Sequence, residues 1–240
     1  MKKSYIIIGV VVVVMLAAIG IYAVINSNSQ SKKQLEENST NIEGTTNTEN
    51  SAKENKDGNI QNNQISNESE ENNMYSTGKH HAEIVVKNYG TIALELDADV
   101  APITVENFAN LVNEGFYNGL TFHRIISGFM IQGGDPLGNG TGGSSKTIKG
   151  EFASNGVKNS ISHVRGTISM ARSSMPNSAS SQFFIVHQDS TFLDGKYAAF
   201  GTVTSGMEVV DKICADTAVE DDNGTVAKNN QPVIEKITII

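Results

Sequence analysis

Hydrophobic and polar positions divide the chain into three stretches of different character. Between Ile6 and Ile25, twenty residues pass without a charge, and Lys2 and Lys3 precede them. Twenty helical residues rise about 30 Å, close to the hydrocarbon thickness of a bilayer. The pattern predicts a transmembrane signal anchor over residues 1–25, with the two lysines on the cytoplasmic side and the rest of the chain outside.

A cleaved signal peptide is the alternative explanation of this apolar stretch. The apolar region of a signal peptide usually runs about 7–15 residues, whereas this run is longer. The small residues that resemble a cleavage site, Ala18 and Gly20, lie inside the run and not after it. The anchor predicts a single-pass protein of the cell membrane, and the cleaved signal predicts a secreted one.

Residues 26–79 are dominated by Asn, Ser, Glu, Gln, Thr and Lys. The only leucine and isoleucine side chains are Leu35, Ile42, Ile60 and Ile65, which are too scattered to bury one another. Such a segment cannot offset the entropy of ordering itself, so we interpret it as a disordered polar linker. Its typical reach is about 40 Å. A partner-binding segment that folds on contact is the alternative.

From residue 81 the pattern changes to an alternation with period two. Residues 84–86 and 92–96 alternate on either side of a turn at 88–90, which predicts a β-hairpin. Pro102 then opens a helical run that Gly115 is placed to end. Further strands are predicted at 122–126, 129–132, 167–171, 182–186, 198–203 and 233–240, and a second helix at 207–215.

Many short strands, glycine-rich turns and two helices indicate a mainly β domain. Its length of about 160 residues is ample for one hydrophobic core. The pattern is typical of an antiparallel closed barrel or of a sandwich, and it does not by itself choose between them.

Residues 122–135, with the sequence FHRIISGFMIQGGD, form the most informative segment. Two strand-like runs there bring an arginine, a glutamine and large apolar side chains together, and a glycine turn is expected to follow. The segment resembles the signature of cyclophilin-type peptidyl-prolyl cis-trans isomerases. Three more segments are similar to that family and stand in its order: 166–172 (GTISMAR), 180–185 (SSQFFI) and 192–201 (FLDGKYAAFG).

The resemblance covers about residues 81–240, and it implies the fold and the activity. It implies an eight-stranded antiparallel closed β-barrel capped by two α-helices, which we place at residues 80–240. It also implies rotation about X–Pro bonds, whose barrier is about 18–20 kcal/mol because the nitrogen lone pair is delocalised into the carbonyl. A donor aimed at the pyramidal nitrogen of the twisted amide stabilises the transition state over the planar ground state.

The family's site residues carry over onto matching positions of this chain. Arg124 takes the position of the charged donor, and Gln132 is expected to hold it and to bond the substrate backbone. His123 and Phe129 complete the catalytic set, His123 as a wall of the pocket without a proton to transfer. The substrate-binding positions implied by the resemblance are Met130, Ala171, Arg172, Gln182, Phe184, Phe192, Leu193 and Tyr197.

Several positions depart from the family's eukaryotic branch and are similar to its bacterial branch. The chain has no tryptophan, and Phe192 stands where eukaryotic members commonly carry one. Tyr197 replaces a histidine at the pocket rim, and Arg172 replaces an asparagine. We expect catalysis to survive these changes. We also expect weak binding of cyclosporin, because the indole N–H that would donate a hydrogen bond is missing.

Charge and composition limit the partners. The formal net charge is −8 and no basic patch occurs, so nucleic acid is not expected as a partner. The glycine-rich residues 138–143 lack the Lys-Ser/Thr of a phosphate loop, and Cys214 is the only cysteine. We expect no metal or other cofactor. We also expect the protein to be a monomer. Proline-containing polypeptides are the expected substrates. A non-catalytic chaperone or adhesion module that binds extended proline-containing segments is the main alternative, and a serine hydrolase is a weaker one.

Overall fold

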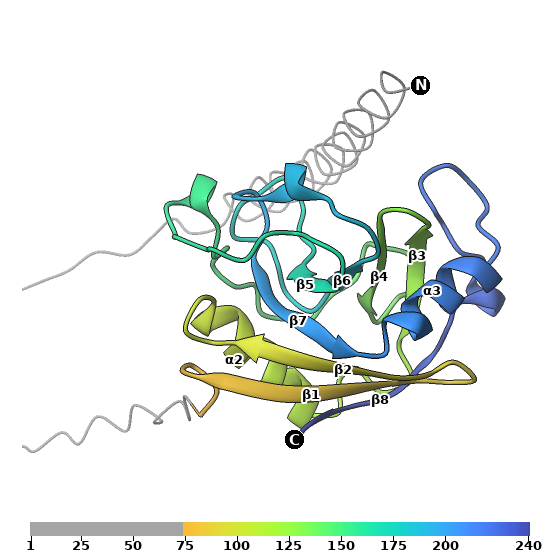
Figure 1. The fold of residues 1–240 in the computed structure, drawn as a ribbon, viewed down its shortest axis with the longest axis horizontal. Coiled ribbons are helices and arrows are strands. Elements are labelled where there is room, and N and C mark those ends of the chain that lie inside the picture. Colours follow the sequence, from red (N-terminus) through yellow and green to blue (C-terminus); the bar gives the residue numbers. More distant parts are fainter. Residues whose placement is uncertain (1–73) are drawn as a thin grey trace, which may run out of the picture. The chain divides into compact units, whose positions relative to one another are not determined.

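The structure, a computed structural model, describes residues 74–240 (Figure 1). The predicted membrane anchor and most of the predicted linker lie outside these residues, and only the linker's last six positions, 74–79, fall within them. Within 74–240, no helix is long and apolar enough to cross a membrane. Tyr75 is attached to the domain, because its backbone N–H donates to Glu106 Oε2 at 2.7 Å and its hydroxyl accepts from Asn113.

Eight antiparallel strands and two α-helices make up the domain. The strands are β1 (Lys79–Val86), β2 (Gly90–Asp97), β3 (Thr121–Ile126), β4 (Met130–Asp135), β5 (Thr167–Met170), β6 (Phe183–Val186), β7 (Ala199–Ser205) and β8 (Ile234–Ile239). The helices are α2 (Pro102–Asn113) and α3 (Met207–Asp216), and three short 3₁₀ turns lie at Ala153–Asn155 (η1), Thr191–Leu193 (η2) and Lys228–Asn230 (η3). The strand order in the sheet is β3-β4-β6-β5-β7-β2-β1-β8. The mainly β class, the hairpin and both predicted helices are therefore confirmed.

The sheet curls so that its two edge strands, β3 and β8, approach each other. Their contact is short: one isolated bridge pairs Thr121 with Val233, and the Phe122 N–H donates to the Pro232 carbonyl at 2.9 Å. Beyond that point β3 bonds to the loop before β8, where the Ile125 N–H donates to Gly224. The sheet is a curled half-barrel, and the predicted full closure is not observed, since one isolated bridge takes the place of a continuous ladder between β3 and β8.

The helices cover apolar surface of the sheet and join its main core. Buried side chains of α2 include Val105 and Phe108, and those of α3 include Val210 and Ile213. Pro102 stands at the start of α2, where its missing N–H costs nothing. The other free N–H groups there are served by the buried Glu151 carboxylate, which accepts from Ile103 and Thr104.

One predicted boundary is wrong in an informative way. A glycine turn was expected after residue 132, but β4 continues through Gly133 and Gly134 to Asp135. Neighbouring backbone lies unusually close there, and a Cβ on Gly133 would stand 2.8 Å from the Thr121 carbonyl. Glycine thus serves close strand packing at this position and not chain reversal. Apart from β1, which begins at Lys79 and not at residue 84, the remaining strand and helix boundaries agree with the predictions to within about two residues, as is usual for such assignments.

Candidate active site

Arg124 and Gln132 face each other across two neighbouring strands. They are direct partners in the β3–β4 register, and the Arg124 Nη1 donates to Gln132 Oε1 at 3.3 Å. Residues opposite each other in an antiparallel pair share one face of the sheet, so this contact follows from the register. The expected support of Arg124 by Gln132 is therefore present in the structure.

A chain of amide contacts continues from Gln132 into the next loop. Gln132 Nε2 donates to Gln182 Oε1 at 2.9 Å, and Gln182 Nε2 donates to the carbonyl of Gly142 at 2.7 Å. The loop itself is folded around the buried carboxylate of Asp135, which accepts the N–H groups of Leu137, Asn139 and Gly140. Arg124 is thereby connected through two glutamines to a loop with a fixed shape.

The Asp135 contacts also engage the backbone N–H groups of the glycine-rich segment that follows it. Burial alone would raise the pKa of Asp135, but the surrounding backbone N–H groups outweigh burial and lower it. The carboxylate therefore stays charged and occupies the N–H groups that a phosphate would need. This role of Asp135 was not predicted, although the residue closes the FHRIISGFMIQGGD segment.

Asn223 is an unpredicted neighbour of the candidate catalytic arginine. The Arg124 Nε donates to the Asn223 carbonyl at 2.8 Å, and its Nη2 donates to Asn223 Oδ1 at 3.1 Å. The sequence signal for this loop, the turn-forming run DDNG at 221–224, indicates a turn but not which strand lies beside it. Burial lowers the pKa of Arg124, opposed by Tyr197 and Asp221, and a guanidinium still remains cationic at neutral pH.

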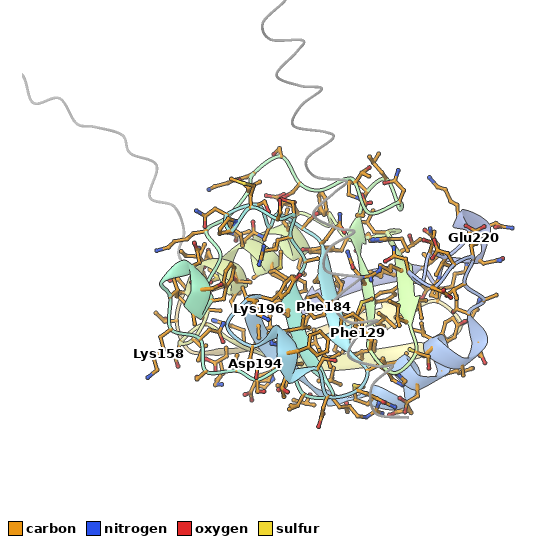
Figure 2. The ribbon with its side chains drawn as sticks, turned by 90° about the horizontal axis from the view of Figure 1, so that it is seen from above. Phe129, Lys158, Phe184, Asp194, Lys196 and Glu220 are labelled. Carbon is orange, nitrogen blue, oxygen red and sulfur yellow. The ribbon has the colours of Figure 1, made fainter. Side chains whose placement is uncertain are left out.

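The predicted proline-binding residues form an apolar cluster of their own, separate from the main core. Met130, Phe184 and Leu193 are its buried members, together with Val186. Partly buried side chains packed against them are Ile126, Phe129, Ala171 and Tyr197, and Figure 2 labels Phe129 and Phe184 among the side chains of this region. Gln132 pairs with Phe184 in the β4–β6 register. This pairing places Gln132, which holds Arg124, beside the cluster.

The rim of the cluster contains Phe192, Tyr197 and Arg172. Phe192 is 51% exposed and its ring centroid lies 5.6 Å from that of Phe129. The Arg172 guanidinium lies between two rings, 4.8 Å from the centroid of Tyr197 and 4.9 Å from that of Phe152, and donates to the Lys196 carbonyl. Its side chain therefore joins two loops of the rim.

The backbone groups of Ala171 and Arg172 differ in their hydrogen bonding. The Ala171 N–H donates to the Gln182 carbonyl at 2.9 Å, so it is already engaged. Among the hydrogen bonds of residues 74–240, none uses the backbone N–H or carbonyl of Arg172. Pairing of Arg172 with an extended peptide stays a prediction, and the free edge is compatible with it.

His123 does not belong to the apolar cluster. Its side chain is only 4% exposed, and neither ring nitrogen has a hydrogen-bond partner within the described residues. Burial lowers the pKa of His123, opposed by Asp135 and reinforced by Arg124, so the ring is neutral. Its expected place in the pocket wall stays a prediction.

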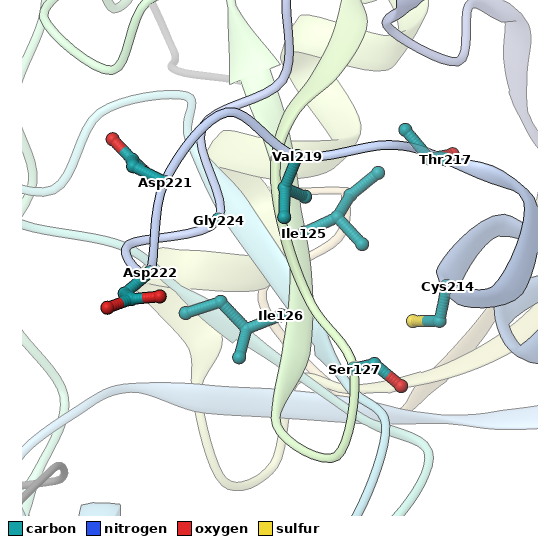
Figure 3. Close-up of a pocket in the computed structure, with 9 residues that line it drawn as sticks. All are labelled: Ile125, Ile126, Ser127, Cys214, Thr217, Val219, Asp221, Asp222 and Gly224. Atoms are coloured by element: carbon teal, nitrogen blue, oxygen red, sulfur yellow. The ribbon is translucent and has the colours of Figure 1, made fainter.

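Two further features complete the surroundings of the site. A cleft of about 200 Å³ lies on the other side of Ile126, where Ile125, Cys214 and Val219 contribute to its lining (Figure 3). It adjoins the apolar cluster through Ile126, and its lining contains none of the predicted site residues. Among residues 74–240, no three His, Cys, Asp or Glu side chains lie together as a metal-binding group.

Comparison with known proteins agrees with this geometry. The sequence family described as cyclophilin type peptidyl-prolyl cis-trans isomerase/CLD matches residues 81–239. The chain therefore belongs to the cyclophilin-type peptidyl-prolyl cis-trans isomerase family, whose members are enzymes.

Curated relatives of the chain are named for the same activity. A peptidyl-prolyl cis-trans isomerase of Helicobacter pylori is 51% identical over 128 residues, which are 52% of this chain and 76% of the relative. Peptidyl-prolyl cis-trans isomerase B of Bacillus subtilis is 50% identical over 117 residues, covering 49% of this chain and 78% of the relative.

A solved structure is similar as well. A cyclophilin-type isomerase of Cryptosporidium parvum, crystallised in the presence of the dipeptide Ala-Pro, aligns with a TM-score of 0.59 and 32% sequence identity. The alignment covers 67% of this chain and 98% of that chain. The similarity thus extends over essentially the whole relative and over two thirds of this chain.

Proposed function

We propose that this chain rotates X–Pro bonds of extended polypeptides, with Arg124 as the donor to the prolyl nitrogen. The observation that carries the proposal is the position of a cationic guanidinium, held by Gln132, next to the apolar cluster that contains Met130 and Phe184. Uncatalysed exchange takes tens of seconds or longer. Acceleration to milliseconds needs about four decades in rate, or roughly 5–6 kcal/mol, with no covalent bond to the enzyme.

The chemistry assigns separate tasks to the two parts of the site. The apolar cluster takes the proline ring, since Phe129, Phe184 and Leu193 present aromatic and aliphatic surface without a competing charge. Arg124 then donates to the nitrogen lone pair, which becomes available only when the amide is twisted, so the contact favours the transition state. The Cryptosporidium relative was crystallised with Ala-Pro, and a prolyl dipeptide is the smallest ligand that this arrangement would take.

A non-catalytic module that captures proline-containing segments is the second candidate. Such a module needs only the apolar cluster and a free backbone edge. Arg124 makes three hydrogen bonds within its own protein. This favours the interpretation as an enzyme, because binding alone does not require a charged side chain to be held in one position.

We further propose that the enzyme acts outside the cytoplasmic membrane on exported proteins during their folding. The uncharged run Ile6–Ile25 supports a membrane anchor, and the polar stretch that follows supports a flexible spacer between membrane and domain. Secretion after signal cleavage is the alternative. In either case the domain acts as a monomer on unfolded chains.

An isomerisation assay on a proline tetrapeptide tests the enzymatic proposal. Residues 74–240 and the full chain are both assayed, and each should accelerate cis-to-trans conversion in proportion to its concentration. Binding of the peptide without any acceleration would support the capture module instead. A chain that neither binds nor accelerates would contradict both candidates.

A further inference from the structure

The guanidinium of Arg124 donates hydrogen bonds to its own protein on two sides. A guanidinium has five N–H donors, and three of them are used: one by Gln132 Oε1, one by the Asn223 carbonyl and one by Asn223 Oδ1. Two donors remain for a substrate. Asn223 therefore supplies more of the contacts that orient this side chain than Gln132 does.

The loop that carries Asn223 is itself closely tied. The Asp221 carboxylate accepts from both the backbone N–H and the hydroxyl of Thr225, at 2.9 and 2.8 Å, and the Gly224 N–H donates to the Asp221 carbonyl at 3.0 Å. Hydrogen bonds to the charged form lower the pKa of Asp221. The turn is thus closed by a carboxylate that is ionised at neutral pH.

The same loop is attached to the strand that bears Arg124. The Ile125 N–H donates to the Gly224 carbonyl at 2.8 Å, and Arg124 forms an isolated bridge with Thr225. Gly224 has a φ of +80° and lies so close to β3 that its Cα has no room for a side chain. Figure 3 shows this loop crossing over β3, with Asp221 and Asp222 on the side away from Cys214.

We propose that Asn223 is a positioning residue for Arg124. The turn closed by Asp221 fixes Asn223 beside the guanidinium. The inference rests on the proposed isomerase function. A long, flexible arginine loses rotamer entropy whenever it is fixed, and contacts made before the substrate arrives remove that cost from the reaction step. Asn223 holds the Nε and Nη2 side, Gln132 holds Nη1, and the plane of the guanidinium is set by both.

The first experiment compares Asn223→Ala with wild type in the isomerisation assay, using residues 74–240 and the full chain. Loss of the Oδ1 contact should lower kcat about threefold to tenfold while KM stays within about twofold, as expected when a contact matters mainly in the transition state. The Asn223→Asp variant retains an oxygen acceptor for Nη2 and should recover most of the wild-type kcat. Asp222→Asn, a change to the neighbouring exposed side chain, serves as the matched control and should leave kcat unaltered.

A second experiment separates positioning from a general effect on the loop. In an Arg124→Ala background, Asn223→Ala should change the residual rate by less than about twofold, because the group that it positions is absent. An equal loss in both backgrounds would show that Asn223 acts independently of Arg124 and would overturn the inference. A wild-type kcat in Asn223→Ala would overturn it too, whereas an inactive wild-type enzyme would instead contradict the proposed function.

Discussion

His163 and Asp194 are joined beneath the apolar cluster, with 2.9 Å between the imidazole Nδ1 and the carboxylate Oδ1. The other ring nitrogen lies 3.0 Å from the hydroxyl oxygen of Ser169, and the imidazole stacks on Phe184 at a centroid distance of 6.0 Å. The order of groups is that of a hydrolytic triad. Ser169 is fully buried, however, so it cannot reach a substrate, and the three residues serve as a polar support below Phe184.

We predict that the folded domain loses stability as the pH falls below about 6.5, the ordinary value for histidine. Burial lowers the pKa of both His163 and His123 in the folded state. The unfolded chain therefore binds protons first, so stability rises with pH across this window and is fully present above 6.5. Melting temperatures measured from pH 8 to pH 5 check the direction.

A His123→Leu variant tests how much His123 contributes to this loss of stability at low pH. Leucine removes two ring nitrogens that have no partner among the described residues and removes one site of proton uptake. Its melting temperature should fall less between pH 7 and pH 5 than that of wild type, whereas His81→Gln, an exposed control, should follow wild type. Parallel pH profiles for wild type and His123→Leu would contradict the assignment.

Replacing Arg124 by alanine should reduce kcat/KM by at least about tenfold to a hundredfold, or roughly 1.4–2.7 kcal/mol of transition-state stabilisation. The melting temperature should change little, since the guanidinium is partly exposed and its partners can bond to water. Arg124→Lys keeps the charge but loses the planar fork that contacts both Gln132 and Asn223. Unchanged turnover in Arg124→Ala would exclude the proposed donor.

Replacing Phe129 by alanine tests the apolar part of the site. Phe129 packs on the buried cluster and its ring lies beside that of Phe192. Its removal should weaken peptide affinity and lower kcat/KM together, because both ground and transition states use the same surface. Titration of a prolyl peptide against the variant gives the affinity. Leu137→Ala, a change to an exposed apolar side chain outside the cluster, is the control, and intact peptide binding by Phe129→Ala would place the proline pocket elsewhere.

Local periodicity predicted most of the elements, and the family resemblance of contiguous motifs named the side chains that the structure gathers in the apolar cluster. Arg124 and Gln132 are eight positions apart and meet through one strand pairing. Asn223 lies 99 positions from Arg124 and belongs to an irregular loop, so no pattern in the sequence predicts their contact. Gly133 shows the same limit, since glycine equally indicates a turn or a close approach of backbones.

The buried Glu151 carboxylate provides a prediction on stability. It is 2% exposed and accepts three hydrogen bonds at the start of α2, from the Ile103 N–H and from the N–H and hydroxyl of Thr104. In Glu151→Gln the amide NH₂ would face donors, so the free energy of unfolding should fall by about 1–3 kcal/mol. For a domain of this size that corresponds to a drop in Tm of several degrees. Glu114→Gln, at an exposed position after the same helix, should leave Tm unchanged.

The location of the domain is tested by protease added to intact, wall-stripped cells. An anchor at Ile6–Ile25 with the rest of the chain outside exposes the polar stretch 26–73 to the protease, while the hydrogen-bonded residues from Tyr75 onward resist cleavage. The expected product is a compact fragment that begins near residue 74 and keeps isomerase activity, with full-length protein released only by detergent. A full-length chain that stays protected would place the domain in the cytoplasm. Abundant soluble protein in the medium that begins after Gly20 would support the cleaved signal peptide.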